Sequence, residues 1–128
     1  MTTDELTTAL RSCAAGLYPL EAGVALLTAE GTFLRRDDFT SRFIEHGTSS
    51  GTPVAAIDWD AAITALHAGE IPCSAGEWRI LMLSASLAGG TPVDLRDAAT
   101  GLDDSNIQRL VTAILHASGK RPEPWLYR

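Results

Sequence analysis

Apolar residues recur at intervals of three and four along most of the chain, a spacing that places side chains on one face of an α-helix. The first such stripe consists of Leu6, Leu10, Cys13 and Leu17. Thr3 or Asp4 can cap the start of this helix, and Gly16 lies near its end. A second helix is expected to run from Pro19, which suits a first helical turn, to Gly31, which can end it in a left-handed conformation.

Two more helices are expected in the middle of the chain. One runs from Asp37 to Gly47, and its apolar face consists of Phe39, Phe43 and Ile44. The next begins after Asp58 and ends before Gly69, and its stripe consists of Trp59, Ala62, Ile63 and Leu66. The stretch 47–53 between them contains Gly, Ser, Thr and Pro, so it is expected to be a flexible connection.

A helix over about 75–88 is expected at the centre of the fold. Ser74 and Glu77 have the spacing of a capping box, which satisfies two free backbone N–H groups at a helix start. The residues that follow are apolar on nearly every side, as in a helix surrounded by others. A last, amphipathic helix over 104–118 is expected on the outside. We predict a core that includes Leu10, Leu27, Phe43, Ile63, Leu81, Leu110 and Ile114.

The predicted fold class is mostly α, a compact bundle of about six helices around the central one. The short segments 32–34 and 54–57 have strand character and can pair into a two-stranded ribbon. Residues 1–119 are expected to form a single helical domain, followed by a tail rich in proline and aromatic residues at 120–128. Cys13 and Cys73 form no Cys-x-x-Cys pair, and we expect both to be small buried apolar groups.

Charge and hydropathy narrow the choice of partners. Sixteen acidic residues against ten Lys plus Arg give a net charge of −6, which disfavours binding to a phosphate backbone. The longest apolar runs fall well short of the roughly 18 to 20 residues that a membrane span needs. The acidic start of the chain does not fit a secretory signal. We therefore expect a cytoplasmic protein with no membrane contact and no cofactor.

Three acidic clusters, Asp37-Asp38, Asp58 with Asp60, and Asp103-Asp104, could act as paired carboxylates or hold a divalent cation. Each cluster lies where a helix is expected to begin. A carboxylate at that position accepts a free backbone N–H and interacts favourably with the helix dipole. Capping therefore explains all three clusters.

The three histidines come shortly before glycines that end helices. In a last turn an imidazole can donate a hydrogen bond to an unpaired carbonyl. His46 falls on the core-facing side of the 37–47 helix, so we expect it to be the most buried of the three. An alternative hypothesis is a small metal-dependent hydrolase, whose polar site would consist of His46, His67, Asp58 and Asp60.

A second alternative is a small DNA-binding regulator. The segments 93–99 and 104–118 can form a helix-turn-helix-like element over 93–118. Its candidate DNA contacts are Gln108, Arg109, Thr112, Lys120 and Arg121, whose side chains suit base edges and phosphates. Asp103 and Asp104 argue against this hypothesis, because they lie at the end that would enter the groove.

The tail carries Trp125, Leu126 and Tyr127, which are costly to expose to water. Two prolines prevent a helix there. The tail is expected either to fold back on its own domain or to dock on another chain, and in the second case these three residues form the partner-binding motif.

Three segments, 34–39, 55–59 and 101–111, resemble parts of small uncharacterised proteins from actinobacteria. This resemblance implies a bacterial cytosolic source and carries no activity, ligand or site residue onto the chain. The sequence shows no converging catalytic set. The leading hypothesis is a non-catalytic protein-interaction or regulatory module, whose partner is another protein or a second copy of the chain.

Overall fold

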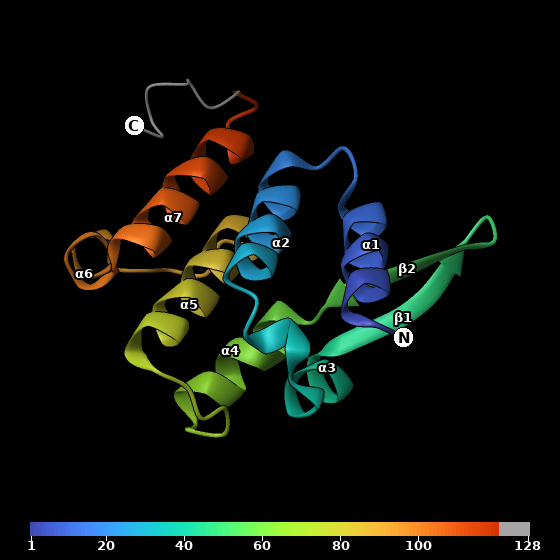
Figure 1. Cartoon of the computed structure of the whole chain (residues 1–128), viewed down its shortest axis with the longest axis horizontal. Coiled ribbons are helices and arrows are strands. Elements are labelled where there is room, and N and C mark those ends of the chain that lie inside the picture. The colour runs from blue at the N-terminus through green and yellow to red at the C-terminus, as the bar shows by residue number, and fades with distance from the viewer. Residues whose placement is uncertain (121–128) are drawn as a thin grey trace.

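The computed structural model describes residues 1–120 and is mostly helical, with one short antiparallel hairpin (Figure 1). The α-helices of this part are α1 (Thr3–Ala14), α2 (Tyr18–Glu30), α3 (Asp37–Phe43), α4 (Trp59–His67), α5 (Ala75–Gly89), α6 (Leu95–Gly101) and α7 (Asp104–Ala117). A 3-10 turn, η1 (Phe33–Arg35), precedes α3, and the strands are β1 (Ile44–Ser49) and β2 (Thr52–Ile57).

Helix α5 lies at the centre, as its apolar surface predicts. It packs most extensively against α2 and also contacts α4 and α7. On one side of the α2–α5 pair, a core contains side chains from α1, the hairpin, α3 and α4; on the other, a smaller core contains side chains from α6 and α7. The α2–α5 pair therefore separates two layers of apolar packing, with α7 at one edge of the molecule (Figure 1).

The starts of α4 and α5 follow the predicted capping chemistry, the cap of α1 is shifted by one residue, and α3 has no side-chain cap. Ser74 and Glu77 form the expected capping box at α5, and Asp58 accepts a hydrogen bond from the Ala61 N–H at the start of α4. At α1 the cap is Thr2, one residue before the predicted Thr3, and it forms a second capping box with Glu5. Thr2 is a better cap than Thr3 because Glu5 stands three residues after it, so the backbone N–H groups of Thr2 and Glu5 both gain a side-chain partner.

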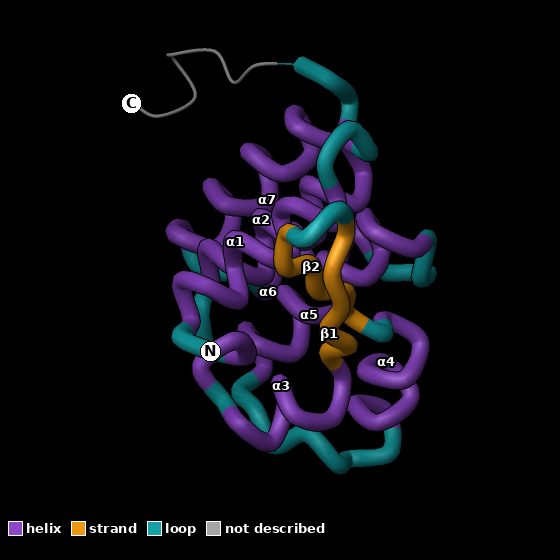
Figure 2. Tube along the Cα trace, turned by 90° about the vertical axis from the view of Figure 1, so that its right-hand side faces the viewer, coloured by secondary structure: helices purple, strands orange, loops and turns teal. Residues whose placement is uncertain are grey.

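The predicted helix over 37–47 is too long, and the predicted pairing of the ribbon is wrong. Helix α3 ends at Phe43, and β1 pairs with β2 in the register Ile44 to Ile57. Ser50 and Gly51 both have positive φ, 50° and 79°, which is the geometry of a tight two-residue hairpin turn. This turn joins adjacent segments, so 44–49 pairs with 52–57, while 33–35 forms the 3-10 turn. The hairpin lies on the face that is turned toward the viewer in Figure 2, which is the right-hand side of Figure 1.

Six of the seven predicted core residues are buried, and Ile114 is 45% exposed. Helix α7 meets α2 and α5 through a face that includes Asn106, Leu110 and Ala113. This face is turned away from the centre of the apolar stripe, so the small Ala113 is buried between the helices and Ile114 is not. Ile114 therefore lies on the outer flank of α7.

Cys13 is exposed and does not belong to the core, contrary to the prediction. Helix α1 buries the face that carries Leu6, Leu10 and Ala14, and Cys13 lies beside that face. Cys73 is partly buried, and burial is the main cause that raises the pKa of its thiol. Both cysteines are free. Among the helices of residues 1–120, none has both the length and the apolar character that crossing a bilayer requires.

Candidate functional site

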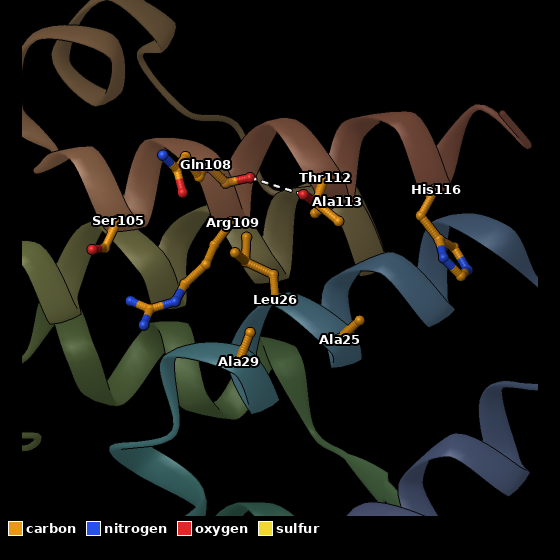
Figure 3. Close-up of a pocket in the computed structure, with 9 residues that line it drawn as sticks. All are labelled: Ala25, Leu26, Ala29, Ser105, Gln108, Arg109, Thr112, Ala113 and His116. Atoms are coloured by element: carbon orange, nitrogen blue, oxygen red, sulfur yellow. Dashed lines mark hydrogen bonds between the residues drawn. The ribbon is translucent and has the colours of Figure 1, made fainter. Parts of the chain in front are cut away.

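A groove runs between α2 and α7 and encloses about 330 Å³ (Figure 3). The groove lies beside α7, which carries candidate contacts of the DNA-binding hypothesis. Three of its lining residues belong to α2 and six to α7: Ala25, Leu26, Ala29, Ser105, Gln108, Arg109, Thr112, Ala113 and His116.

The floor of the groove is apolar and consists mainly of small side chains. Ala25 and Ala29 lie one turn apart on α2, and Ala113 lies opposite them on α7. Leu26 is 1% exposed and closes the bottom of the groove. Because each alanine contributes a single methyl group, the two helices leave space between them.

Arg109 is positioned on the wall of the groove by its own helix. Its Nη1 donates a hydrogen bond to Asn106 Oδ1 at 2.8 Å. Asn106 is itself held, because it is buried and its backbone N–H donates to the capping carboxylate of Asp103 at 2.8 Å. The Arg109 side chain extends from α7 toward α2 (Figure 3). This arrangement fixes a positive charge beside an apolar floor, with guanidinium N–H groups left over for a ligand.

The other end of the groove contains a histidine–carboxylate pair. His116 Nε2 lies 2.7 Å from Glu21 Oε1, and Glu21 Oε2 accepts a hydrogen bond from the Gly16 N–H at 2.7 Å. The bond to His116, followed by the bond to Gly16, lowers the pKa of the Glu21 carboxyl. Tyr18 packs edge-on against the His116 ring at 6.2 Å between centroids and is 54% exposed. Exposed aromatic surface therefore adjoins this end of the groove.

The helix pair proposed for DNA binding forms, with α6 at Leu95–Gly101 and α7 at Asp104–Ala117. Its candidate contacts do not share one outward face. Gln108, Arg109 and Thr112 line the groove beside α2, and the Thr112 hydroxyl donates to the Gln108 carbonyl at 3.0 Å. Lys120 is exposed beyond the end of α7, and Arg121 lies outside the described residues.

Within residues 1–120, the four residues of the hydrolase hypothesis do not gather into one metal-binding group. His46 is exposed on β1, where it pairs with Ala55, so the prediction of a partly buried helical histidine is wrong. The cause is the early end of α3, which moves His46 out of the helix. Asp58 caps the start of α4 and Asp60 lies in its first turn, whereas His67 is its last residue.

The His67 ring contacts Trp78 edge-on at 5.4 Å between centroids. Residues 1–120 contain no group of three His, Cys, Asp or Glu side chains arranged to hold a metal ion.

The Asp37-Asp38 cluster departs from the capping interpretation. Asp58 and Asp103 accept the expected backbone hydrogen bonds. The residue before α3 is Arg36, and no side chain caps that helix. Asp38 instead forms an ion pair with Arg36 at 2.6 Å, and this bond is the main cause that lowers the pKa of the Asp38 carboxyl. The Arg36 guanidinium also donates to the Pro72 carbonyl at 2.6 Å.

The tail residues Trp125, Leu126 and Tyr127 lie outside the described residues, so the partner-binding motif predicted there stays a prediction. The sequence did not reveal the contribution of α2 to the groove. Its one available signal is the pair of alanines at positions 25 and 29, on the same face of a helix. No family model matches the chain, and no curated protein or solved structure is significantly similar to it.

Proposed function

We propose that the chain is a non-catalytic protein-interaction module that binds a segment of a partner protein in the α2–α7 groove. The observation that carries this proposal is the groove itself, an apolar floor beside a positioned arginine. Partner-binding surfaces commonly combine an apolar pocket for an anchor side chain with polar groups at the rim that set orientation.

The chemistry of the lining defines the partner segment. The alanine floor accepts one large apolar side chain, whose burial supplies the binding free energy. Arg109 stands beside that position and pairs with a carboxylate on the partner, because an arginine fork binds a carboxylate through two hydrogen bonds. We infer a partner segment in which a large apolar residue lies close to an Asp or Glu.

The polar side chains of the groove support binding better than catalysis. Arg109 is bonded to Asn106, and His116 is bonded to Glu21. The only serine of the lining, Ser105, is eleven positions from His116 on the same helix, about 16 Å along its axis. A histidine cannot activate a hydroxyl at that distance. We place this module in a bacterial cytosol, where Cys13 and Cys73 would stay reduced.

The test is site-specific photo-cross-linking followed by an affinity measurement. A photoreactive phenylalanine is placed at Ala29 in the groove or at Ala99, an exposed alanine on α6 that serves as control. We expect one protein to be cross-linked from position 29 and not from position 99. That protein is then purified and its binding to the chain is measured by calorimetry.

The variants Ala29→Glu and Ala99→Glu provide the matched comparison. Filling the groove with a carboxylate at position 29 is expected to weaken binding by at least about tenfold, because it blocks the floor and competes for Arg109. The same change at position 99 leaves the affinity unchanged. Equal cross-linking from both positions, no cross-linking from position 29, or wild-type affinity of Ala29→Glu would overturn the proposal.

A further inference from the structure

A second concavity lies between α1, α2 and η1 and shares no lining residue with the groove. It encloses about 350 Å³. Its lining is mostly polar and consists of Thr3, Asp4, Thr7, Thr8, Arg11, Thr28, Gly31, Leu34 and Arg35. Two arginines therefore face one hollow in a protein whose net charge is −6.

Of the seven arginines in residues 1–120, three form ion pairs and Arg109 donates to Asn106. Arg36, Arg42 and Arg79 form ion pairs with Asp38, Glu70 and Asp97. Within residues 1–120, the side chains of Arg11 and Arg35 have neither an ion pair nor a hydrogen bond. Two guanidinium groups without a partner thus line the same concavity, and free guanidinium N–H donors attract an oxyanion.

Backbone geometry brings the Arg35 guanidinium close to α2. Gly31 ends α2 with φ at 86°, and a methyl group built on it would lie 3.5 Å from both Cζ and Nη2 of Arg35. The guanidinium therefore packs over a residue without a side chain. Helix α2 has no basic residue in its last turn, so Arg35 also offsets the negative end of that helix. The experiment below separates this structural role from binding.

Threonine hydroxyls supply further donors. The hydroxyls of Thr8 and Thr28 are engaged, since they donate to the carbonyls of Asp4 and Val24 at 2.9 and 2.7 Å. The Thr7 side chain, 9% exposed, has no hydrogen-bond partner within residues 1–120. A hydroxyl beside two guanidinium groups is a common element of phosphate recognition.

Asp4 is the one carboxylate of the lining, and it repels an anion placed beside it. It stands seven residues before Arg11 on α1, a separation of about 10 Å along the helix axis. Thr7 stands three residues after Asp4, about one helical turn, so the two arginines outweigh the Asp4 carboxylate by charge and not by distance. The lining keeps a net charge of +1 when the two arginines and Asp4 are counted.

We propose that this concavity is an anion site for a small molecule that carries one phosphate group. The phosphate would be held by Arg11 and Arg35 with the Thr7 hydroxyl. The hollow is larger than inorganic phosphate needs, and the buried Leu34 side chain offers an apolar wall for the rest of the ligand. The site is independent of the α2–α7 groove, so it can be present whether or not the groove binds a protein.

The probe is inorganic phosphate, titrated at constant ionic strength into the full-length protein while the amide ¹H–¹⁵N shifts are recorded. We expect saturable shifts at the amides of Thr7, Thr28 and Arg35. The variants Arg11→Gln and Arg35→Gln should each raise the Kd by at least about fivefold, because each removes a charged donor. Arg96→Gln is the matched control, since Arg96 is an exposed arginine of α6 without an ion pair. The Arg96→Gln protein should bind phosphate with the wild-type Kd.

Three outcomes would contradict the proposed site. The amide shifts do not saturate, neither Arg11→Gln nor Arg35→Gln changes the Kd, or Arg96→Gln loses as much affinity for phosphate as they do. If Arg35→Gln lowers the Tm without changing the Kd, Arg35 serves only the end of α2 and the proposed site is wrong. Arg11 stands in the last turn of α1, so the Tm of Arg11→Gln is measured as well, and a raised Kd with an unchanged Tm reports binding alone.

Discussion

At Gly23, α2 lies directly against the backbone of α5. A methyl group built on Gly23 would lie 2.6 Å from the Ser84 carbonyl oxygen and 2.7 Å from the Ala88 Cβ. These are backbone and Cβ atoms, which cannot move aside as the end of a flexible side chain can. The absence of a side chain at this position is what allows the two central helices to pack so closely.

Gly23→Ala is therefore expected to destabilise the protein by about 1–3 kcal/mol, the usual cost of overpacking a core. This cost exceeds the gain of about 1 kcal/mol that alanine offers over glycine in a helix. Gly89→Ala is the control, because a methyl group there meets no atom within 4 Å and Gly89 is the last residue of α5. Chemical denaturation should show the control to be as stable as the wild type or more so. A neutral Gly23→Ala would contradict the close approach.

On the scale of elements, α7 shows how a helix can bury a face other than its most apolar one. Leu110 is 6% exposed, while Ile114, one turn further on, is 45% exposed. Leu110→Ala is expected to cost about 2–4 kcal/mol, because it leaves a cavity between α7 and the α2–α5 pair. Ile114→Ala should cost less than about 1 kcal/mol, since half of that side chain is already in water.

Urea denaturation of the two variants measures this difference. Equal losses would mean that Ile114 is as well packed as Leu110, contrary to its position on the outer flank. The two substitutions both replace a large aliphatic residue with alanine in the same helix, so differences in helix propensity contribute little to the comparison.

Helix ends were more predictable than the contacts between helices. A cap depends on residues three apart in sequence, and Asp58, Ser74 and Gly31 occupy the expected ends in the structure. The boundary at Phe43 was missed because the helical spacing of Phe39 and Phe43 continues into Ile44. The tight turn at Ser50-Gly51 pairs the residues on either side of it as strands. The chain therefore leaves the helix after Phe43.

The groove was not predictable in the same way. Helix α2 contributes Val24 and Leu27 to one core cluster, and Ala22 and Leu26 to the other. A helix that is apolar on several sides carries no periodic signal for which neighbour covers which side. The polar side chains of α7 were recognised as a distinct face, but sequence alone could not place α2 opposite them. Only the tertiary structure therefore shows that residues such as Ala25 line a groove.

On the scale of the whole molecule, carboxylates connect different helices through ion pairs and hydrogen bonds. Asp97 on α6 pairs with Arg79 on α5, and Glu21 on α2 pairs with His116 on α7. Carboxyl groups whose pKa is lowered in the fold are Glu21, Asp38, Glu77 and Asp97. For Glu77 the first cause is the hydrogen bond from the Ser74 backbone N–H. For Asp97 it is the hydrogen bond from Arg79.

These lowered pKa values predict how stability changes with pH. A carboxyl group with a lower pKa in the folded state stabilises the fold at pH values above its unfolded pKa, which is about 4.5 for Glu and 3.8 for Asp. That stability is lost as the pH falls through the folded pKa, because the folded protein must then take up protons that weaken the bonds. The Tm is therefore expected to be nearly constant near neutral pH and to fall below about pH 4.5.

Glu77→Gln isolates one of these groups. At neutral pH the variant should melt about 2 °C below the wild type, because glutamine is a weaker partner for the Ser74 N–H than a carboxylate. At a pH well below 4.5 the two Tm values should converge, because protonated Glu77 is then as neutral as glutamine. Glu45→Gln is the control, since Glu45 is exposed on β1 and has no ion pair within residues 1–120. A gap between Glu77→Gln and the wild type that stayed constant down to pH 3 would show that the capping carboxylate makes no pH-dependent contribution to stability.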